Sequence, residues 1–140
     1  MSSIWQKNVT VDGLNQRNAD TLASHLGMQV TTIGDDFLTV SMPVNATTHQ
    51  PMGLLHGGAS VALAETVGSI ASNIAVDEQH FCVGMEINAN HVRAVRNGLV
   101  IATARPLHLG KTSHVWEIRI EQEQGELVCI SRLTMAVRKR

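Results

Sequence analysis

The sequence lacks an excess of charge of either sign. Its 140 residues include 11 Lys and Arg against 12 Asp and Glu, which gives a formal net charge of -1. A protein that binds nucleic-acid phosphates carries a basic surface, so this balance argues against nucleic acid as a partner. The basic residues 138–140 form a short tail, which we interpret as solvent-exposed rather than as a polyanion site.

Long apolar runs and paired cysteines are also lacking. The first residues have no signal-peptide-like apolar stretch, and the longer uncharged segments are interrupted by Gly, Pro, Ser and Asn, so we expect a soluble, cytoplasmic protein without membrane contact. Cys82 and Cys129 fit no metal or redox spacing, which predicts buried, reduced thiols. Because the chain also lacks zinc signatures, a phosphate-binding Gly-rich loop and a Gly-x-Ser-x-Gly turn, we expect no metal and no redox cofactor.

The residues that are present predict one α+β domain over residues 1–140. Asn18 or Asp20 is the expected N-cap of a short helix ending near His25, preceded by a smaller helical turn at 9–16. A long, mostly apolar helix is expected at 58–76, and strands at 28–33, 37–42, 81–94, 99–109, 113–122 and 127–137. The predicted architecture is a curved antiparallel sheet of five or six strands around the long central helix.

Glu65 is the single formally charged residue between Phe37 and Val76, and it falls within the long helix. Burial of an unpaired carboxylate is costly, so its presence in such an apolar helix needs a reason. An ion pair or a dimer contact would be a structural reason. We favour a chemical one, in which Glu65 attacks a carbonyl or activates water.

The turn at Gly57 and Gly58 opens this helix. Free N–H groups at a helix start, together with the helix dipole, can hold an oxyanion. Several polar residues are predicted to converge near Glu65: Gln50 and His56 from the loop before the helix, Ser69 and Ser72 at i+4 and i+7, and His91 by strand parity with Val83, Met85, Ile87 and Ala89. Each also has a structural interpretation, such as bracing the turn or packing in the core.

The spacing of Gly57 and Glu65 predicts an assembly. Eight residues of helix separate them by about 12 Å, whereas one reacting carbonyl has to contact both the N–H donor and the attacking group. Two antiparallel copies of the helix would bring the two groups together. The spacing therefore predicts a symmetric homodimer with two shared sites.

The chain resembles the hotdog-fold acyl-CoA thioesterases. The resemblance rests on QPMGLLHGGASVALAE at 50–65, with further blocks VGMEINANH at 83–91, PLHLG at 106–110 and SRLT at 131–134, and it covers nearly the whole chain. The chain is similar in particular to the type that includes the enterobactin proofreading thioesterase and the 1,4-dihydroxy-2-naphthoyl-CoA hydrolase. The second of these enzymes belongs to menaquinone biosynthesis. Met52 is a departure, because relatives have Phe there.

The resemblance implies hydrolysis of an aromatic or bicyclic acyl-CoA, with coenzyme A as part of the substrate and no cofactor. It implies that Glu65 is nucleophile or general base, that the Gly57 amide polarises the thioester carbonyl, that Gln50 and His56 hold water and substrate, and that Ser69 and His91 support the acyl pocket. The implied coenzyme A groove comprises Gly84, His91, Val92, Arg93, Ala94, His108, Leu109, Gly110, Lys111, Thr112 and Ser113. It also implies a homotetramer built as a dimer of dimers.

Three other functions stay open at this point. The substrate can be a misacylated aryl carrier protein of siderophore synthesis instead of a CoA ester. The same scaffold can bind acyl-CoA without catalysis, although the solitary Glu65 argues against this. It also supports dehydration of hydroxyacyl thioesters, which uses a His and a carboxylate as acid and base.

Overall fold

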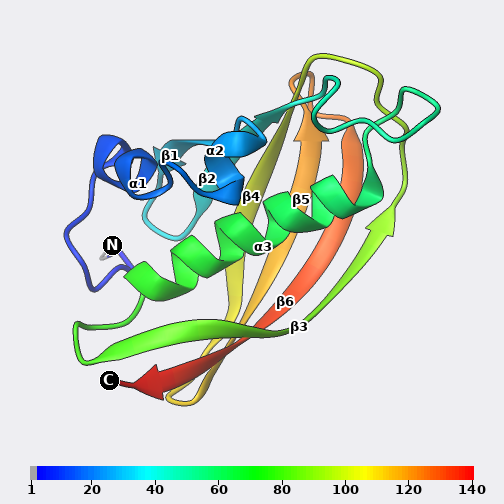
Figure 1. The fold of residues 1–140 in the computed structure, drawn as a ribbon. Helices are drawn as coiled ribbons and strands as arrows, with labels where there is room; N and C mark the ends of the chain where they lie inside the picture. Colours follow the sequence, from blue (N-terminus) through cyan, green and yellow to red (C-terminus); the bar gives the residue numbers. More distant parts are fainter. Residues whose placement is uncertain (1–2) are drawn as a thin grey trace.

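The computed structural model describes residues 3–140, which form one long helix, two short helices and six strands (Figure 1). In chain order the elements are α1 (Val11–Arg17), α2 (Leu22–His25), β1 (Gln29–Ile33), β2 (Leu38–Pro43), α3 (Gly57–Ile74), β3 (His80–His91), β4 (Leu99–Leu109), β5 (Ser113–Gln122) and β6 (Leu127–Lys139). The predicted α+β architecture is confirmed, with the larger of the two expected strand numbers.

The strands form one antiparallel sheet in the order β1-β2-β4-β5-β6-β3. The sheet is curved, and α3 crosses its concave face (Figure 1). β3 pairs with β6 along one side only, from His80 opposite Lys139 to His91 opposite Cys129. Within residues 3–140 its other side has no strand beside it. A long unpaired edge is the part of a sheet best able to pair with a second chain.

The core lies between α3 and the sheet. Trp116, Ile118 and Ile120 of β5 are completely buried, as their alternation with charged residues predicted. Gly68 lets the helix approach closely, because a Cβ atom at this position would overlap the Cδ2 atom of Leu133 on β6. Cys82 and Cys129 are buried and free, as predicted, and burial raises the pKa of both thiols.

The parity predicted for β3 is wrong in its first half. Val83 and Met85 are 44% and 64% exposed and face away from the core, whereas Ile87 and Ala89 pack against it. The reason is an irregularity in the pairing with β6 between Gly84 and Glu86, where one extra residue shifts the side chains to the opposite face. Cys82 and Gly84 therefore face α3 before this bulge, and Ile87, Ala89 and His91 after it.

The N-terminal helices also differ from the prediction. The N-cap of α2 is Thr21, whose N–H donates to Ser24 Oγ at 3.3 Å, and not Asn18 or Asp20. Asn18 instead ends α1, and α1 is longer than α2. The cause is the local hydrogen bonding of the Asn18–Thr21 turn, in which Asn18 O accepts from both the N–H and the hydroxyl of Thr21.

Candidate active site

The start of α3 presents one free backbone donor. The imidazole of His56 caps the helix, because its Nδ1 accepts from Gly58 N at 2.7 Å. Ala59 N and Ser60 N both donate to His56 O, at 3.0 and 3.2 Å. Gly57 N has no acceptor within residues 3–140. The His56 side chain thus accepts from the Gly58 N–H and leaves the Gly57 N–H available for a ligand.

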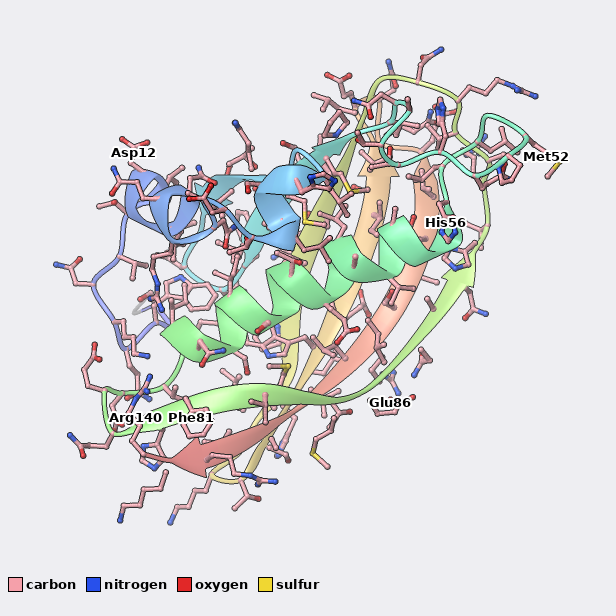
Figure 2. The ribbon with its side chains drawn as sticks, viewed as in Figure 1. Asp12, Met52, His56, Phe81, Glu86 and Arg140 are labelled. Carbon is pink, nitrogen blue, oxygen red and sulfur yellow. The ribbon has the colours of Figure 1, made fainter. Side chains whose placement is uncertain are left out.

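Gln50 is held next to this donor by its own loop. Its Oε1 accepts from Met52 N, and its backbone N donates to Leu54 O at 2.8 Å. The side-chain NH₂ has no acceptor in the described part of the chain, so it is free to donate. Figure 2 shows His56 at the start of α3 and Met52 at the outer tip of the loop. Met52 is 72% exposed and lines neither of the cavities described below.

The free N–H group belongs to a first cavity, which we call the amide half-site. It measures about 460 Å³ and is lined by Gln50, Gly57, His91, Val92, Arg93 and Ala94, among others. A Cβ atom on Gly57 would lie 3.1 Å from His91 Nε2, so the absence of a side chain at Gly57 keeps room between the imidazole and the helix. The structure therefore places Gln50 and His91 beside Gly57. The prediction that they converge on Glu65 is wrong for the single chain, because Glu65 lies eight residues further along α3 and lines a different cavity.

Glu65 belongs to a second cavity, the carboxylate half-site, which measures about 400 Å³. Ser69 lies in the same wall of α3, and Gly84 approaches from β3, where an added Cβ atom would lie 3.2 Å from Glu65 Oε2. Glu65 makes no hydrogen bond or ion pair with any residue from 3 to 140. Ser69 thus lies beside the carboxylate, as predicted. Gly84 lies there too, apart from the 91–94 segment with which the coenzyme A groove was expected to include it.

The expectation that Glu65 is buried is wrong for the single chain. The residue is exposed, because the sheet covers one side of α3 and ends at β3, next to Gly84. Desolvation of the carboxylate would therefore have to come from a molecule outside this chain.

Ser72 does not join the predicted polar strip. It is completely buried, and its hydroxyl shares a hydrogen bond with His114 Nδ1 of β5. Burial lowers the pKa of His114, and the neighbouring His108 lowers it further. Ser72 and His114 therefore form a neutral polar pair in the core, at a distance from the solvent-facing carboxylate.

Sequence reasoning missed one wall of the carboxylate half-site. Asn18 and Thr21 of the α1–α2 turn and Leu22 at the start of α2 line the same cavity as Glu65. In the sequence, Asn18 indicated only a helix cap. Nothing there shows that the α1–α2 turn packs alongside α3.

The 108–113 segment lies apart from both half-sites. It forms the β4–β5 turn, closed by Gly110 N donating to Ser113 O at 2.9 Å. Leu109, Gly110 and Lys111 line a third cavity of about 560 Å³ together with Ala75 and Asp77, which follow the C-terminal end of α3. Within one chain, the predicted coenzyme A contacts therefore fall in three separate places, with Gly84 in the carboxylate half-site, 91–94 in the amide half-site and the 108–113 segment at the third cavity.

Gly57 and Glu65 also stay apart in one chain. Eight residues of α3 separate them, about 12 Å along the axis, and each opens into its own cavity. A single copy of the described chain thus holds two incomplete halves of the predicted site.

Other features bear on cofactors and membranes. Among residues 3–140, no three His, Cys, Asp or Glu side chains are grouped so that they can hold a metal ion. That the reaction needs no metal or other cofactor stays a prediction. In the same part of the chain, no helix combines the length and apolar character required to cross a bilayer.

Comparison with known proteins identifies the family. The model of the family described as "Thioesterase superfamily" matches residues 52–129. The chain is 51% identical to the proofreading thioesterase EntH of Cronobacter turicensis and 47% identical to the 1,4-dihydroxy-2-naphthoyl-CoA hydrolase of Escherichia coli, in each case over 134 residues that cover 96% of this chain and 98% of the relative.

A solved structure extends this similarity to the fold. The crystal structure of a thioesterase from Haemophilus influenzae has a TM-score of 0.96 and 46% identity, and the match covers 97% of this chain and 95% of that one. The chain therefore belongs to the thioesterase superfamily, has the hotdog fold of these enzymes and is a thioester hydrolase.

Proposed function

We propose that the protein hydrolyses aromatic or bicyclic acyl-CoA thioesters, of the benzoyl-CoA or 1,4-dihydroxy-2-naphthoyl-CoA type, with Glu65 as nucleophile or general base. One observation carries this proposal. Gly57 N and the Glu65 carboxylate are both free of partners within residues 3–140, and each opens into a cavity. A donor for a developing oxyanion and a group able to attack its carbon are the two parts that thioester hydrolysis needs.

A homodimer would join the two halves. Gly84 lies beside Glu65 and His91 beside Gly57, and both belong to the unpaired edge strand β3. Antiparallel pairing of two β3 strands would place the Gly84 region of one opposite the His91 region of the other. The amide half-site of each protomer would then meet the carboxylate half-site of its partner.

In such a site the Gly57 N–H and the positive end of the α3 dipole stabilise the charge on the thioester oxygen. In one route Glu65 forms a bond to the carbonyl carbon, the carbon–sulfur bond breaks, and coenzyme A leaves as a thiolate that takes up a proton. Water then opens the mixed anhydride. In the other route Glu65 removes a proton from a water molecule that attacks directly. Both give free acid and thiol.

The neighbouring residues have different parts in this proposal. The free NH₂ of Gln50 and the imidazole of His91 line the amide half-site and bind the thioester or water. The ring of His56 caps α3 and so acts by positioning the Gly57 N–H. Ser69 contributes to the wall of the acyl pocket beside Glu65.

The dimer also accounts for the separated coenzyme A contacts. The third cavity lies at the C-terminal end of α3 and the amide half-site at its N-terminal end, so antiparallel copies would bring one protomer's 108–113 turn towards the partner's 91–94 segment. Arg93 and Lys111 would supply cations for the phosphates of coenzyme A. A dimer of such dimers is the proposed complete assembly.

Replacement of Glu65 by Gln tests the proposed chemistry. The variant keeps the shape of the side chain but can neither attack nor accept a proton, so we expect kcat on benzoyl-CoA, measured by thiol release, to fall by about 10²–10⁴. Thermal stability should not change, since Glu65 makes no bond within residues 3–140. Glu123→Gln, in an exposed turn, is the matched control. A wild-type rate in Glu65→Gln would remove Glu65 from the mechanism.

A second candidate substrate is a misacylated aryl carrier protein. It is favoured by the 51% identity to a relative named as a proofreading thioesterase. The experiment is to compare kcat/KM for one acyl group carried by coenzyme A and by an aryl carrier protein. If kcat/KM were clearly higher for the carrier-bound acyl group, the acylated carrier protein would become the proposed substrate in place of the CoA ester.

A further inference from the structure

The carboxylate half-site continues into a smaller cavity along α3. This second space measures about 220 Å³ and is lined by Leu14, Arg17, Asn18, Ser69, Ile70 and Asn73, among others. Asn18, Ser69 and Ile70 line both cavities. The two spaces therefore adjoin, and together they follow the helix from Glu65 towards its C-terminal end. An acyl group whose carbonyl lies at Glu65 has room in this direction.

Asn18 carries a buried donor without an acceptor at the junction of the two cavities. Its Nδ2 is shielded from solvent and has no hydrogen-bond partner within residues 3–140. A buried polar group left unpaired costs about 1–3 kcal/mol, and native proteins have few such groups. An unpaired donor on a residue that lines both cavities is therefore a candidate for binding a ligand.

The backbone of Asn18 fixes where this donor lies. Asn18 N donates to Leu14 O and Asn15 O at the end of α1, at 3.3 and 3.2 Å. Asn18 O accepts from Thr21 N at 3.2 Å and from the Thr21 hydroxyl at 2.6 Å. The main chain is thus held from both sides, while the side chain takes no part in holding the turn.

Two other polar side chains in these walls already have hydrogen-bond partners. Asn73 donates to Ser69 O and Cys82 O, and accepts from Cys82 N. The Thr66 hydroxyl donates to Ala62 O at 2.7 Å. Asn18 Nδ2 is thus the one buried side-chain donor lining the two cavities, among residues 3–140, that still lacks an acceptor.

We infer that the side-chain amide of Asn18 binds a hydroxyl group on the acyl part of the substrate, which makes Asn18 a specificity-determining residue for hydroxylated aromatic acyl groups. This inference rests on the proposed function. Ser69, which shares both cavities with Asn18, lies one helical turn beyond Glu65, about 6 Å along the axis. An acyl group with its carbonyl at Glu65 that extends along these two cavities would carry a ring hydroxyl towards the residue that lines both of them.

The test compares benzoyl-CoA with 3- and 4-hydroxybenzoyl-CoA in the wild type and in Asn18→Leu, which keeps the side-chain size but removes the amide. The readout is the ratio of kcat/KM for the better hydroxylated substrate to that for benzoyl-CoA. We expect Asn18→Leu to lower this ratio about tenfold relative to the wild type, as for loss of one hydrogen bond. Asn8→Leu, at an exposed position, should leave the ratio at its wild-type value.

Binding without turnover separates this inference from the proposed chemistry. Hydroxyphenacyl and phenacyl thioethers of coenzyme A cannot be hydrolysed, and calorimetry gives the ratio of their Kd values for the wild type and both variants. A ratio that changes in Asn18→Leu supports the inference even if the enzyme turns over neither benzoyl ester. If the ratio of Kd values in Asn18→Leu equals that of the wild type, the inference is overturned. A lowered Tm in the same variant would then show that Asn18 has a structural role only.

Discussion

Gly57 combines two properties at the residue scale. Its N–H has no acceptor within residues 3–140, and its lack of a side chain leaves room beside His91 Nε2. Gly57→Ala would place a methyl group 3.1 Å from that nitrogen and narrow the space for a carbonyl oxygen. We expect kcat/KM to fall about 10–100-fold, comparable to weakening one oxyanion donor, with an unchanged circular dichroism spectrum.

The double variant Gly57→Ala/His91→Ala identifies the cause of that loss. It removes the imidazole that the new methyl group would contact. If kcat/KM is higher in the double variant than in Gly57→Ala, part of the loss in the single variant is due to displacement of His91. Wild-type kcat/KM in the single variant would contradict the role given to the close approach.

His114 makes the stability of the protein depend on pH. Burial lowers the pKa of this histidine in the folded state, whereas an unfolded histidine has a pKa of about 6.5. Below that pH the unfolded chain takes up a proton that the folded chain does not, so stability decreases as pH falls. We expect Tm to drop between about pH 7.5 and 5.5, and to drop less in His114→Gln. The control variant His25→Gln, at an exposed position, should show the same dependence of Tm on pH as the wild type. If His114→Gln also showed the wild-type dependence of Tm on pH, this prediction would be wrong.

Individual site residues could be predicted from the sequence where helix or loop position alone decides their place. Gly57 opens the helix, Ser69 follows Glu65 by one turn, and the structure confirms both positions. The exposure of Glu65 could not be predicted, since it depends on where the sheet ends. The same holds for Asn18, whose place in the same cavity as Glu65 depends on how the α1–α2 turn packs.

At the scale of elements, the contact of α3 with β6 depends on Gly68. Gly68→Ala should gain up to about 1 kcal/mol in helix propensity, but the added methyl group overlaps Leu133 in a filled core, which costs about 1–3 kcal/mol. We expect a net loss of stability, measured as a lower midpoint of urea unfolding. Leu133→Val in the same background shortens the side chain that clashes. Its combined effect should be smaller than the sum of the two single effects, and strict additivity would contradict the proposed overlap.

The elements themselves show what a single sequence can and cannot specify. The antiparallel pair β5 and β6 was predictable because alternation in β5 and the turn residues Gln124-Gly125 between the two strands are local signals. Asn97-Gly98 is a misleading signal, since the strands on either side of it, β3 and β4, are not neighbours in the sheet. The bulge at Gly84–Glu86 was not, since it is defined by pairing with β6, which lies more than forty residues away in the sequence. It determines that Gly84 faces Glu65 while His91 faces Gly57, so the arrangement of the site depends on a non-local irregularity.

At the scale of the whole molecule, one chain has two half-sites on one helix and an unpaired edge strand beside them. This arrangement predicts that no protomer is active through its own residues alone. It also predicts that damage to the two halves can be separated between chains. Glu65→Gln inactivates the carboxylate half-site, and Gly57→Val, which fills the space beside His91, inactivates the amide half-site.

Mixing these two variants after joint refolding tests the shared site directly. Each homodimer has two defective sites, but every mixed dimer has one site that combines an intact Gly57 with an intact Glu65. Random association at equal amounts makes half of the dimers mixed, so about a quarter of the wild-type thiol release per protomer should return. Each variant refolded with itself is the control. If the mixture stays as inactive as its parents while size-exclusion chromatography shows dimers, the carboxylate and the amide do not meet across a subunit boundary.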